Sequence, residues 1–255
     1  MKVFDLYKYL DSAIPTSLSC TWDNDGLMCC SNPEKEVKKV LITLDITEKA
    51  VDYAAENGFD VILSHHPLIF KKLGSIEPGI GSAKKAIKLI KNEITAISFH
   101  TRLDALTGGV NDALCKKLSI RNPQPFGPDG EQMGRIGNFD APMTVEEVCA
   151  RIKTELGSPV ILASACGKPA HRVAVLGGDG KDFTHEAIKA GADTYISGRI
   201  GYNMMMEAAE LGINLIEAGH FFTEDPVCEA LARLTKTFLP SAATEIFHSN
   251  EIKVL

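Results

Sequence analysis

Short apolar runs that alternate with helix-forming sequence constrain the fold of this chain more than any other feature. In the first half, the runs at 40–44, 61–63 and 94–99 are short and largely apolar, without a regular alternation of polar and apolar residues. Strands that are buried on both faces, as in parallel sheets, show this pattern. Amphipathic helices are expected between the runs, and strand–helix alternation predicts an α/β fold. The second half repeats the pattern at 159–163, 173–176, 194–197 and 214–217.

The stretch 121–137 interrupts this alternation, because it contains three prolines and four glycines. Both residue types break regular structure, and we interpret the stretch as the crossing between two lobes. The first lobe is predicted to comprise 1–122 with 225–255, and the second to comprise 123–224. Each lobe is expected to contain a mostly parallel or mixed sheet.

Local signals predict several turns and helix ends. Thr47 is expected to cap a helix that ends near Gly58, and Ser82 to cap the next helix. Thr144 and Glu147 form a capping-box pattern that predicts a helix start in the second half. The sequence Gly-Gly-Asp-Gly at 177–180 is interpreted as a tight turn rather than an anion-binding loop. The three methionines at 204–206 are expected to fill a core.

Composition argues against several classes of protein. No apolar run in the 255 residues approaches the ~20 that a membrane span needs, and the N-terminus lacks the apolar segment of a signal peptide. The seven cysteines include no Cys-x-x-Cys pair, which favours thiols in a reducing cytoplasm over disulfides or a zinc ribbon. A net charge of −6 argues against a nucleic-acid partner. We therefore expect a cytoplasmic protein that binds neither membranes nor nucleic acid.

Side chains that bind metals follow three of the predicted strands, where four of the seven histidines and two carboxylates lie. Ligands bind at the carboxyl edge of an open α/β sheet, and imidazole with carboxylate is the ligand set of borderline divalent metals. The residues are His65 and His66 after 61–63, His100 and Asp104 after 94–99, and His220 and Glu224 after 214–217.

Each of these motifs has a second explanation when taken alone. His65 and His66 point to opposite faces of a strand unless the chain turns at Pro67, so backbone groups could equally satisfy them. Asp104 could cap a turn instead of binding a metal. His100 is expected to support Asp104 or a ligand histidine from behind rather than to bind the metal itself.

His220 and Glu224 are four residues apart, a spacing that places two side chains on one face of a helix. Such pairs also occur as polar neighbours on solvent-exposed surfaces. The argument for a metal site therefore depends on all three strand ends together, because each of them would otherwise have to carry metal-binding residue types by chance. His65, His66, Asp104, His220 and Glu224 are five candidate ligands, more than the three that a catalytic zinc normally takes. They suit two metal ions with a bridging carboxylate.

Five motifs, in this order along the chain, resemble one family of proteins. The family is the Nif-three-like dinuclear-metal hexameric proteins, commonly labelled GTP cyclohydrolase I type 2 homologs. The resemblance runs from about Phe4 to the C-terminus and is to the short form, without the central domain that longer members insert. The motifs are Trp22-Asp23-Asn24-Asp25-Gly26-Leu27, Ser64-His65-His66-Pro67-Leu68, His100-Thr101-Arg102-Leu103-Asp104-Ala105, Gly109-Val110-Asn111-Asp112 and Gly219-His220-Phe221-Phe222-Thr223-Glu224.

The resemblance implies two interlinked α/β lobes with the metal site between them, and a ring-shaped homohexamer with its sites facing the interior. It also implies two divalent ions per chain (zinc, iron or manganese), held by the same five ligands, with Asp104 and Glu224 as bridges. The residues expected to support the metals or surround the substrate are His100, Arg102, Trp22, Asn24 and Arg199.

Three positions depart from the family pattern. Arg102 stands where Asn is expected, Arg199 where an acid is usual, and Asn203 where His is frequent. Two added guanidinium groups would favour a small anionic ligand. The alternative is that both arginines pair with nearby acids such as Asp23 or Asp25.

The expected function is hydrolysis of a nucleotide or another phosphate-bearing small molecule. A metal-bound water with a lowered pKa would attack an electrophilic centre while the second metal holds an oxyanion. The family label would make that centre the purine ring of GTP. The alternative is a non-catalytic regulator or metal-handling protein that uses the hexameric ring as a scaffold.

Overall fold

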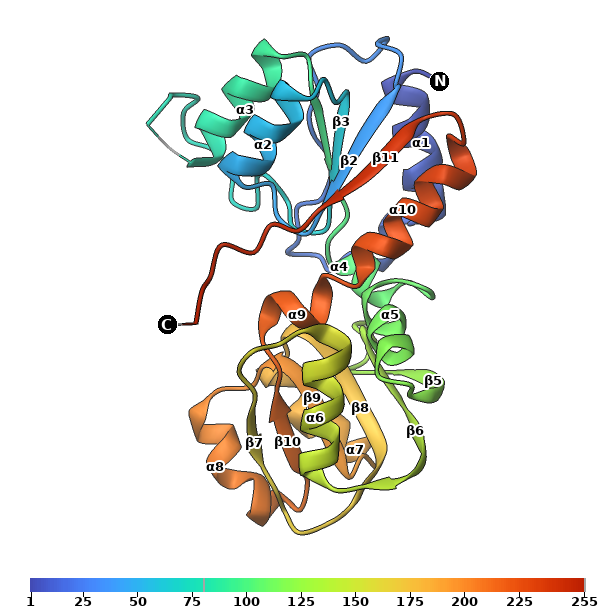
Figure 1. Cartoon of the computed structure of the whole chain (residues 1–255), viewed down its shortest axis with the longest axis vertical. Helices are drawn as coiled ribbons and strands as arrows, with labels where there is room; N and C mark the ends of the chain where they lie inside the picture. The colour runs from blue at the N-terminus through green and yellow to red at the C-terminus, as the bar shows by residue number, and fades with distance from the viewer. Residues whose placement is uncertain (80, 255) are drawn as a thin grey trace. The chain divides into compact units, whose positions relative to one another are not determined.

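The computed structural model describes residues 1–79 and 81–254. The chain divides into two compact units, and the first unit is completed by a segment that follows the second (Figure 1). Unit 1 comprises Met1–Leu103 with Val227–Glu251, and unit 2 comprises Asp104–Pro226 with the tail from Ile252. Each unit contains a sheet flanked by helices, which confirms the predicted α/β class.

The division between the units differs from the predicted boundary after residue 122. It falls between Leu103 and Asp104, inside the short helix α4 (Thr101–Ala105). The cause is helix α5 (Val110–Lys117), whose buried apolar side chains belong to the core of unit 2. The chain returns to unit 1 at Val227, close to the predicted residue 225.

The sheet of unit 1 has five strands. They are β1 (Gly26–Cys29), β2 (Lys39–Thr43), β3 (Val61–Ser64), β4 (Thr95–Ser98) and β11 (Ala243–Phe247), in the order β1-β4-β3-β2-β11. All neighbours are parallel except β1, which pairs antiparallel with β4 at one edge. The register places Phe247, Thr43, Ser64 and Ser98 in one row across the four parallel strands. The segments that follow this register row therefore leave the sheet side by side at its carboxyl edge.

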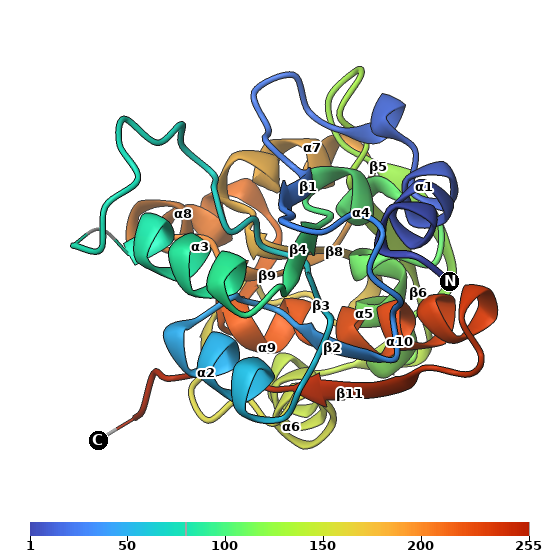
Figure 2. The ribbon, with the colours of Figure 1, turned by 90° about the horizontal axis from the view of Figure 1, so that it is seen from above.

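Helices cover both faces of the unit 1 sheet. They are α1 (Val3–Ala13), the 3-10 turn η1 (Thr16–Leu18), α2 (Glu48–Glu56), α3 (Gly81–Lys91) and α10 (Val227–Phe238). α2 and α3 lie side by side on one face, and α1 and α10 lie side by side on the other (Figure 2). Leu41 and Ile62 of the strands pack with Val51 of α2 and Leu89 of α3 in a buried cluster. Each such side chain contributes about 1.5–3 kcal/mol by burial.

The sheet of unit 2 has six strands. They are β5 (Arg121–Phe126), β6 (Gly134–Met143), β7 (Leu162–Ser164), β8 (Ala170–Asp179), β9 (Thr194–Arg199) and β10 (Asn214–Glu217). The order is β5-β6-β8-β9-β10-β7, with β8, β9 and β10 parallel and the other pairs antiparallel. The mixed sheet agrees with the prediction.

The remaining helices belong to unit 2. They are α6 (Val145–Leu156), the 3-10 turn η2 (Lys181–Phe183), α7 (Thr184–Lys189), α8 (Tyr202–Leu211) and α9 (His220–Glu224). Leu114 of α5 and Val148 of α6 share one buried cluster with Val173, Ile196 and Ile216 of the central strands. α5 and α6 therefore cover the same face of the sheet.

Residues 121–137 form β5 and the start of β6, so their interpretation as a crossing between lobes was wrong. β5 is an edge strand, where a proline without an N–H group removes no essential ladder bond. Gly134 and Gly137 do not form a turn. They lie within β6, where the lack of a side chain lets residues of β5 pack closely against this strand. A Cβ on Gly134 would overlap the ring of Phe126, and a Cβ on Gly137 would overlap the carbonyl of Arg121.

The predicted helix signals are confirmed at two of three starts. The Thr47 hydroxyl accepts a hydrogen bond from the first turn of α2, and Gly58 beyond its end has a φ of 67°. Thr144 and Glu147 form both bonds of the capping box of α6. The prediction for Ser82 was wrong, because α3 begins one residue earlier and contains Ser82 in its first turn.

The methionines of α8 do not fill a core. Ala208 is the buried residue of this helix, and Met206 is 65% exposed. The reason is that α8 packs on the end of the sheet, against β10 and the edge strand β7.

Within residues 1–79 and 81–254, the structure contains no helix with the length and apolar character of a membrane span. All seven cysteines lie in these residues, and none is in a disulfide.

Candidate metal centre

Three histidines leave the carboxyl edge of the unit 1 sheet from neighbouring strands. His65 and His66 follow β3, and His100 follows β4. Their ring centroids are 4.9 Å apart for His65 and His66, 5.3 Å for His65 and His100, and 5.8 Å for His66 and His100. Each ring offers a nitrogen within 4.8 Å of the nitrogens of the other two. These three residues form a group that could bind a metal ion.

His65 and His66 approach the same space because the chain bends immediately after β3. The Ser64 hydroxyl donates to the His66 carbonyl at 2.8 Å, and the His66 N–H donates to the Leu44 carbonyl at 2.9 Å. The sharp exit from the strand that was expected at Pro67 is therefore confirmed.

Each of the three imidazoles has an oxygen acceptor at Nδ1. The acceptor is the Phe99 carbonyl for His65 (3.0 Å), Asp45 for His66 (2.7 Å) and Asp23 for His100 (2.8 Å). Carbonyl and ionised carboxylate oxygens only accept hydrogen bonds, so Nδ1 of each ring carries the proton. In a neutral imidazole this arrangement leaves the lone pair of Nε2 to bind a metal.

Asp23 contacts His100 and Thr101, whereas the sequence had suggested its side chain only as a possible partner for an arginine. Its side chain is 1% exposed and accepts hydrogen bonds from the N–H and the hydroxyl of Thr101 as well as from His100. Burial alone would raise the pKa of this carboxyl, but the hydrogen bonds from His100 and Thr101 hold the pKa far below its usual range. Asp23 is therefore ionised at neutral pH and orients His100.

Unit 2 contributes a second imidazole–carboxylate pair, from α9. Nε2 of His220 lies 2.9 Å from Oε2 of Glu224, so the predicted helical spacing of four residues is confirmed. Gly219 precedes the helix with a φ of 86°, a conformation that favours glycine. The Glu224 side chain is buried and His220 is about half exposed.

Two glycines make room for the Glu224 carboxylate. A Cβ on Gly178 would overlap this carboxylate, and a Cβ on Gly177 would lie 3.0 Å from Glu224 Cγ. Both glycines lie near the end of β8, so the interpretation of 177–180 as a tight turn was wrong. Because neither glycine has a side chain, α9 can pack closely against the end of β8.

Asp104 is buried in unit 2 and belongs to α4. The Asn111 amide donates to the Asp104 carbonyl at 3.3 Å, and its oxygen accepts from the Gly177 N–H at 2.8 Å. Asn111 thus links the backbone of Asp104 to the strand that packs on Glu224. Binding of the same ions by residues of both units remains a prediction.

Arg102 does not extend into a ligand pocket. It is 1% exposed, and it binds Asp25 at 3.0 Å, Asp11 at 2.8 Å and the Ile14 carbonyl at 2.8 Å. Its guanidinium carbon also lies 4.5 Å from the centre of the Phe99 ring. The expectation that Arg102 contacts the substrate was therefore wrong, and the alternative of pairing with nearby acids is confirmed for this residue.

The other residues expected around a ligand are exposed. The Trp22 ring is 56% exposed and lies edge-on to the rings of Phe70 and His100. The Asn24 amide donates to the Ile69 carbonyl. Arg199 lies on the surface of unit 2, and the structure shows no side-chain partner for it among the residues it describes.

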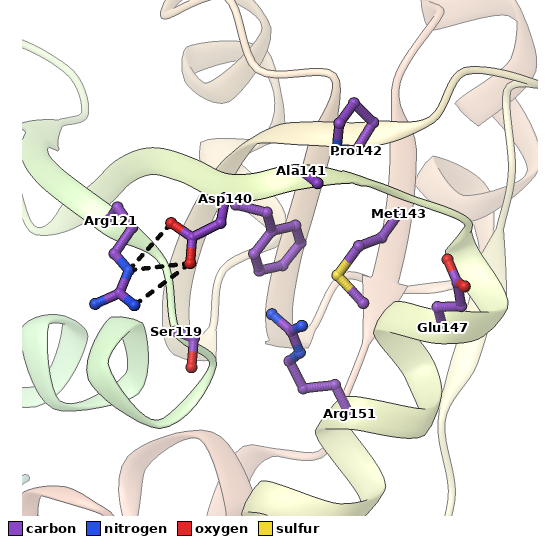
Figure 3. Close-up of a pocket in the computed structure, with 9 residues that line it drawn as sticks. Ser119, Arg121, Asp140, Ala141, Pro142, Met143, Glu147 and Arg151 are labelled. Atoms are coloured by element: carbon purple, nitrogen blue, oxygen red, sulfur yellow. Dashed lines mark hydrogen bonds and ion pairs between the residues drawn. The ribbon is translucent and has the colours of Figure 1, made fainter.

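A surface hollow of about 420 Å³ in unit 2 is lined by none of these histidines (Figure 3). Arg121 and Asp140 pair across its wall at 3.3 Å. Arg151 extends from α6, donates to the Leu118 carbonyl and lies 5.0 Å from the centre of the Phe139 ring. The charged side chains of the wall are thus largely paired with one another or with the backbone.

The residues present fit a divalent transition metal. Three imidazoles are a ligand set for zinc, iron or manganese, and each ring has at Nδ1 the oxygen partner that metal-binding histidines typically have. In unit 2, a buried carboxylate lies in a space from which side chains are excluded.

The fold and the grouped histidines define the class of protein, an α/β protein with a candidate metal-binding site at a sheet edge. Comparison with known proteins identifies the family. The family model described as Duf34/NIF3 (NGG1p interacting factor 3) matches residues 1–253. The chain belongs to this family, which confirms the resemblance seen in the sequence motifs.

Individual relatives agree. A "GTP cyclohydrolase 1 type 2 homolog" of Clostridium perfringens is 34% identical, with 99% of this chain and 98% of the relative covered. A protein of the same description from Methanocaldococcus jannaschii is 31% identical, with 88% and 90% covered. The crystal structure of a Staphylococcus aureus protein has a TM-score of 0.90 and 27% identity, with 100% of this chain and 99% of that protein covered.

Proposed function

We propose that the protein is a dinuclear-metal-dependent hydrolase that acts on a nucleotide or another phosphate-bearing small molecule. The observation that carries the proposal is the group of three histidines in unit 1, each of which offers a ring nitrogen within 4.8 Å of those of the other two and has an oxygen facing its Nδ1. Bound divalent ions supply a nucleophile at neutral pH and neutralise negative charge as it develops on the substrate.

We further propose that the two units share the metal centre, which binds two ions of zinc, iron or manganese. His65 and His66 would bind through Nε2, and His220 would bind with the carboxylates of Asp104 and Glu224. Support comes from the sequence motifs, which are those of the family, and from the buried position of both carboxylates. A carboxylate with two oxygens can bridge two ions, and Asp104 and Glu224 are assigned this role.

The residues of the chain then have separate tasks. Asp45 holds His66 in the tautomer that binds metal, and Asp23 orients His100 beside it. The exposed ring of Trp22, beside His100, offers a surface on which a nucleotide base can stack. Arg199, exposed and without a side-chain partner in the described residues, is the remaining arginine proposed to bind an anionic group.

Homohexamer formation is a further part of the proposal. The family resemblance suggests it, and α8 supports it with Tyr202 at 76% and Met206 at 65% exposure. Apolar side chains clustered on a surface are typical of protein–protein contacts. Light scattering at micromolar concentration should give six copies, and a stable monomer would contradict this part.

The decisive experiment combines metal content with turnover. Protein reconstituted with zinc, iron or manganese is analysed for metal and tested on nucleotides, including the GTP in the relatives' description, and on phosphate esters. His66→Ala in unit 1 and Glu224→Gln in unit 2 should each lose metal and activity, while the exposed control Lys189→Ala should keep both. Metal binding at two ions per chain without turnover of any substrate would favour the non-catalytic scaffold.

A further inference from the structure

A row of polar side chains crosses the carboxyl edge of the unit 1 sheet. The register row contains Phe247, Thr43 and Ser64 on β11, β2 and β3. Two residues beyond each of these lie Ser249, Asp45 and His66. Neighbouring members of this second row are hydrogen-bonded to each other.

The contacts run from the C-terminal segment to the histidine. The Ser249 hydroxyl donates to Asp45 Oδ2 at 3.2 Å, and it accepts from the Asp45 N–H at 3.0 Å. Asp45 Oδ1 accepts from His66 Nδ1 at 2.7 Å. One carboxylate therefore uses one oxygen for the serine and the other for the imidazole.

Asp45 needs this support more than Asp23 does. The Asp45 side chain is 42% exposed, so water competes for its oxygens, whereas Asp23 is 1% exposed and anchored by Thr101. A carboxylate that rotates freely in water cannot fix the ring it faces, because each rotamer presents a different oxygen. The reciprocal bonds with Ser249 select one rotamer of Asp45.

We propose that Ser249 and Asp45 are positioning residues that fix Nε2 as the metal-binding nitrogen of His66, so that the segment after β11 sets the metal affinity of the site. This inference rests on the proposed metal centre for its affinity effect. Outer partners of metal-binding histidines typically change affinity by about 10–100-fold when they are removed. Ser249 acts on His66 only through Asp45, so its removal is expected to change the affinity less, by about fivefold, the equivalent of one typical hydrogen bond.

The tautomer of His66 provides a test that requires no metal. In the metal-free protein at pH 8, where an ordinary histidine is neutral, long-range ¹H–¹⁵N correlation spectra report which nitrogen carries the proton. The wild type should show a proton on Nδ1. Asp45→Ala should move it toward Nε2, and Ser249→Ala should give a mixture. Ser249→Thr, which keeps the hydroxyl, and Ser241→Ala, at an exposed turn before β11, should match the wild type.

Zinc affinity, measured by competition with a chromophoric chelator, provides the second readout. Asp45→Ala should weaken binding by about 10–100-fold and Ser249→Ala by about fivefold, with Ser249→Thr restoring it. An Nδ1 proton retained in both alanine variants, or equal zinc affinity of Ser249→Ala and wild type, would overturn the inference. Wild-type protein that binds no zinc would instead refute the proposed metal centre, and the tautomer of the metal-free protein would still decide the role of Ser249 and Asp45.

Discussion

Replacing Arg102 by methionine should destabilise unit 1 without affecting a ligand. The methionine keeps much of the length of the aliphatic stem, and it removes the guanidinium that binds Asp25, Asp11 and a carbonyl and lies against Phe99. Asp25 is 6% exposed, so its carboxylate would be left buried beside an apolar side chain. Loss of one partner of a buried ion pair typically costs about 3–5 kcal/mol.

This loss can be measured as a shift of the thermal unfolding midpoint, followed by circular dichroism. At about 2–4 °C per kcal/mol for a chain of this size, Arg102→Met should melt roughly 10 °C below the wild type. Adding Asp25→Asn should recover part of the difference, because the buried charge is then removed. The exposed Arg199→Met is the matched control and should change stability by less than about 0.5 kcal/mol.

Nucleotide binding separates this explanation from a substrate role. Arg102→Met, measured below its melting temperature and loaded with metal, should bind a nucleotide as the wild type does. If the variant melts like the wild type but loses nucleotide affinity, Arg102 reaches the ligand and the burial argument is wrong.

Three further outcomes follow from the described contacts. If Glu224 bridges two ions as proposed, Glu224→Ala should empty both metal positions, whereas His65→Ala should weaken one. Elemental analysis distinguishes the two results, and full occupancy of Glu224→Ala would rule out the bridge. Gly178→Ala should displace the Glu224 carboxylate and lower metal content, while alanine at Gly130, in open space, should leave metal content unchanged. Burial raises the pKa of the Cys115 thiol from 9.0 to about 12, so stability should be intact below pH 9 and fall above it by up to about 1.4 kcal/mol per pH unit. Urea unfolding from pH 8 to 11 should show a shallower decline for Cys115→Ala, and equal slopes would contradict this assignment.

The sequence predicts those parts of the site that depend on local geometry. His220 and Glu224 follow helical spacing, and the histidines after β3 and β4 follow from the position of ligands at strand ends. Short, largely apolar runs identified the central parallel strands, because burial on both faces favours apolar side chains on both. These features are encoded within a few residues of one another.

Contacts between distant segments were not predictable in this way. Arg102 is 91 residues from Asp11 and 77 from Asp25, and only the folded sheet shows that these acids meet it. Ser249 and Asp45 carry no motif of their own, and their relation to His66 follows from strand register. The edge strand β5 was missed because prolines normally argue against a strand, and its place at the edge removes that conflict.

The discontinuity of unit 1 has a consequence for how the protein is made. Asp45 and Ser249 are 204 residues apart, and the whole of Asp104–Pro226 is synthesised between them. Domains generally fold as the chain emerges from the ribosome, so Asp104–Pro226, the main part of unit 2, can fold while unit 1 still lacks β11. Until then β2 is an open apolar edge, which can pair with other chains. Synthesis of β11 and of the segment that follows it thus closes the sheet and, in the same step, brings Ser249 to the Asp45 carboxylate that contacts His66.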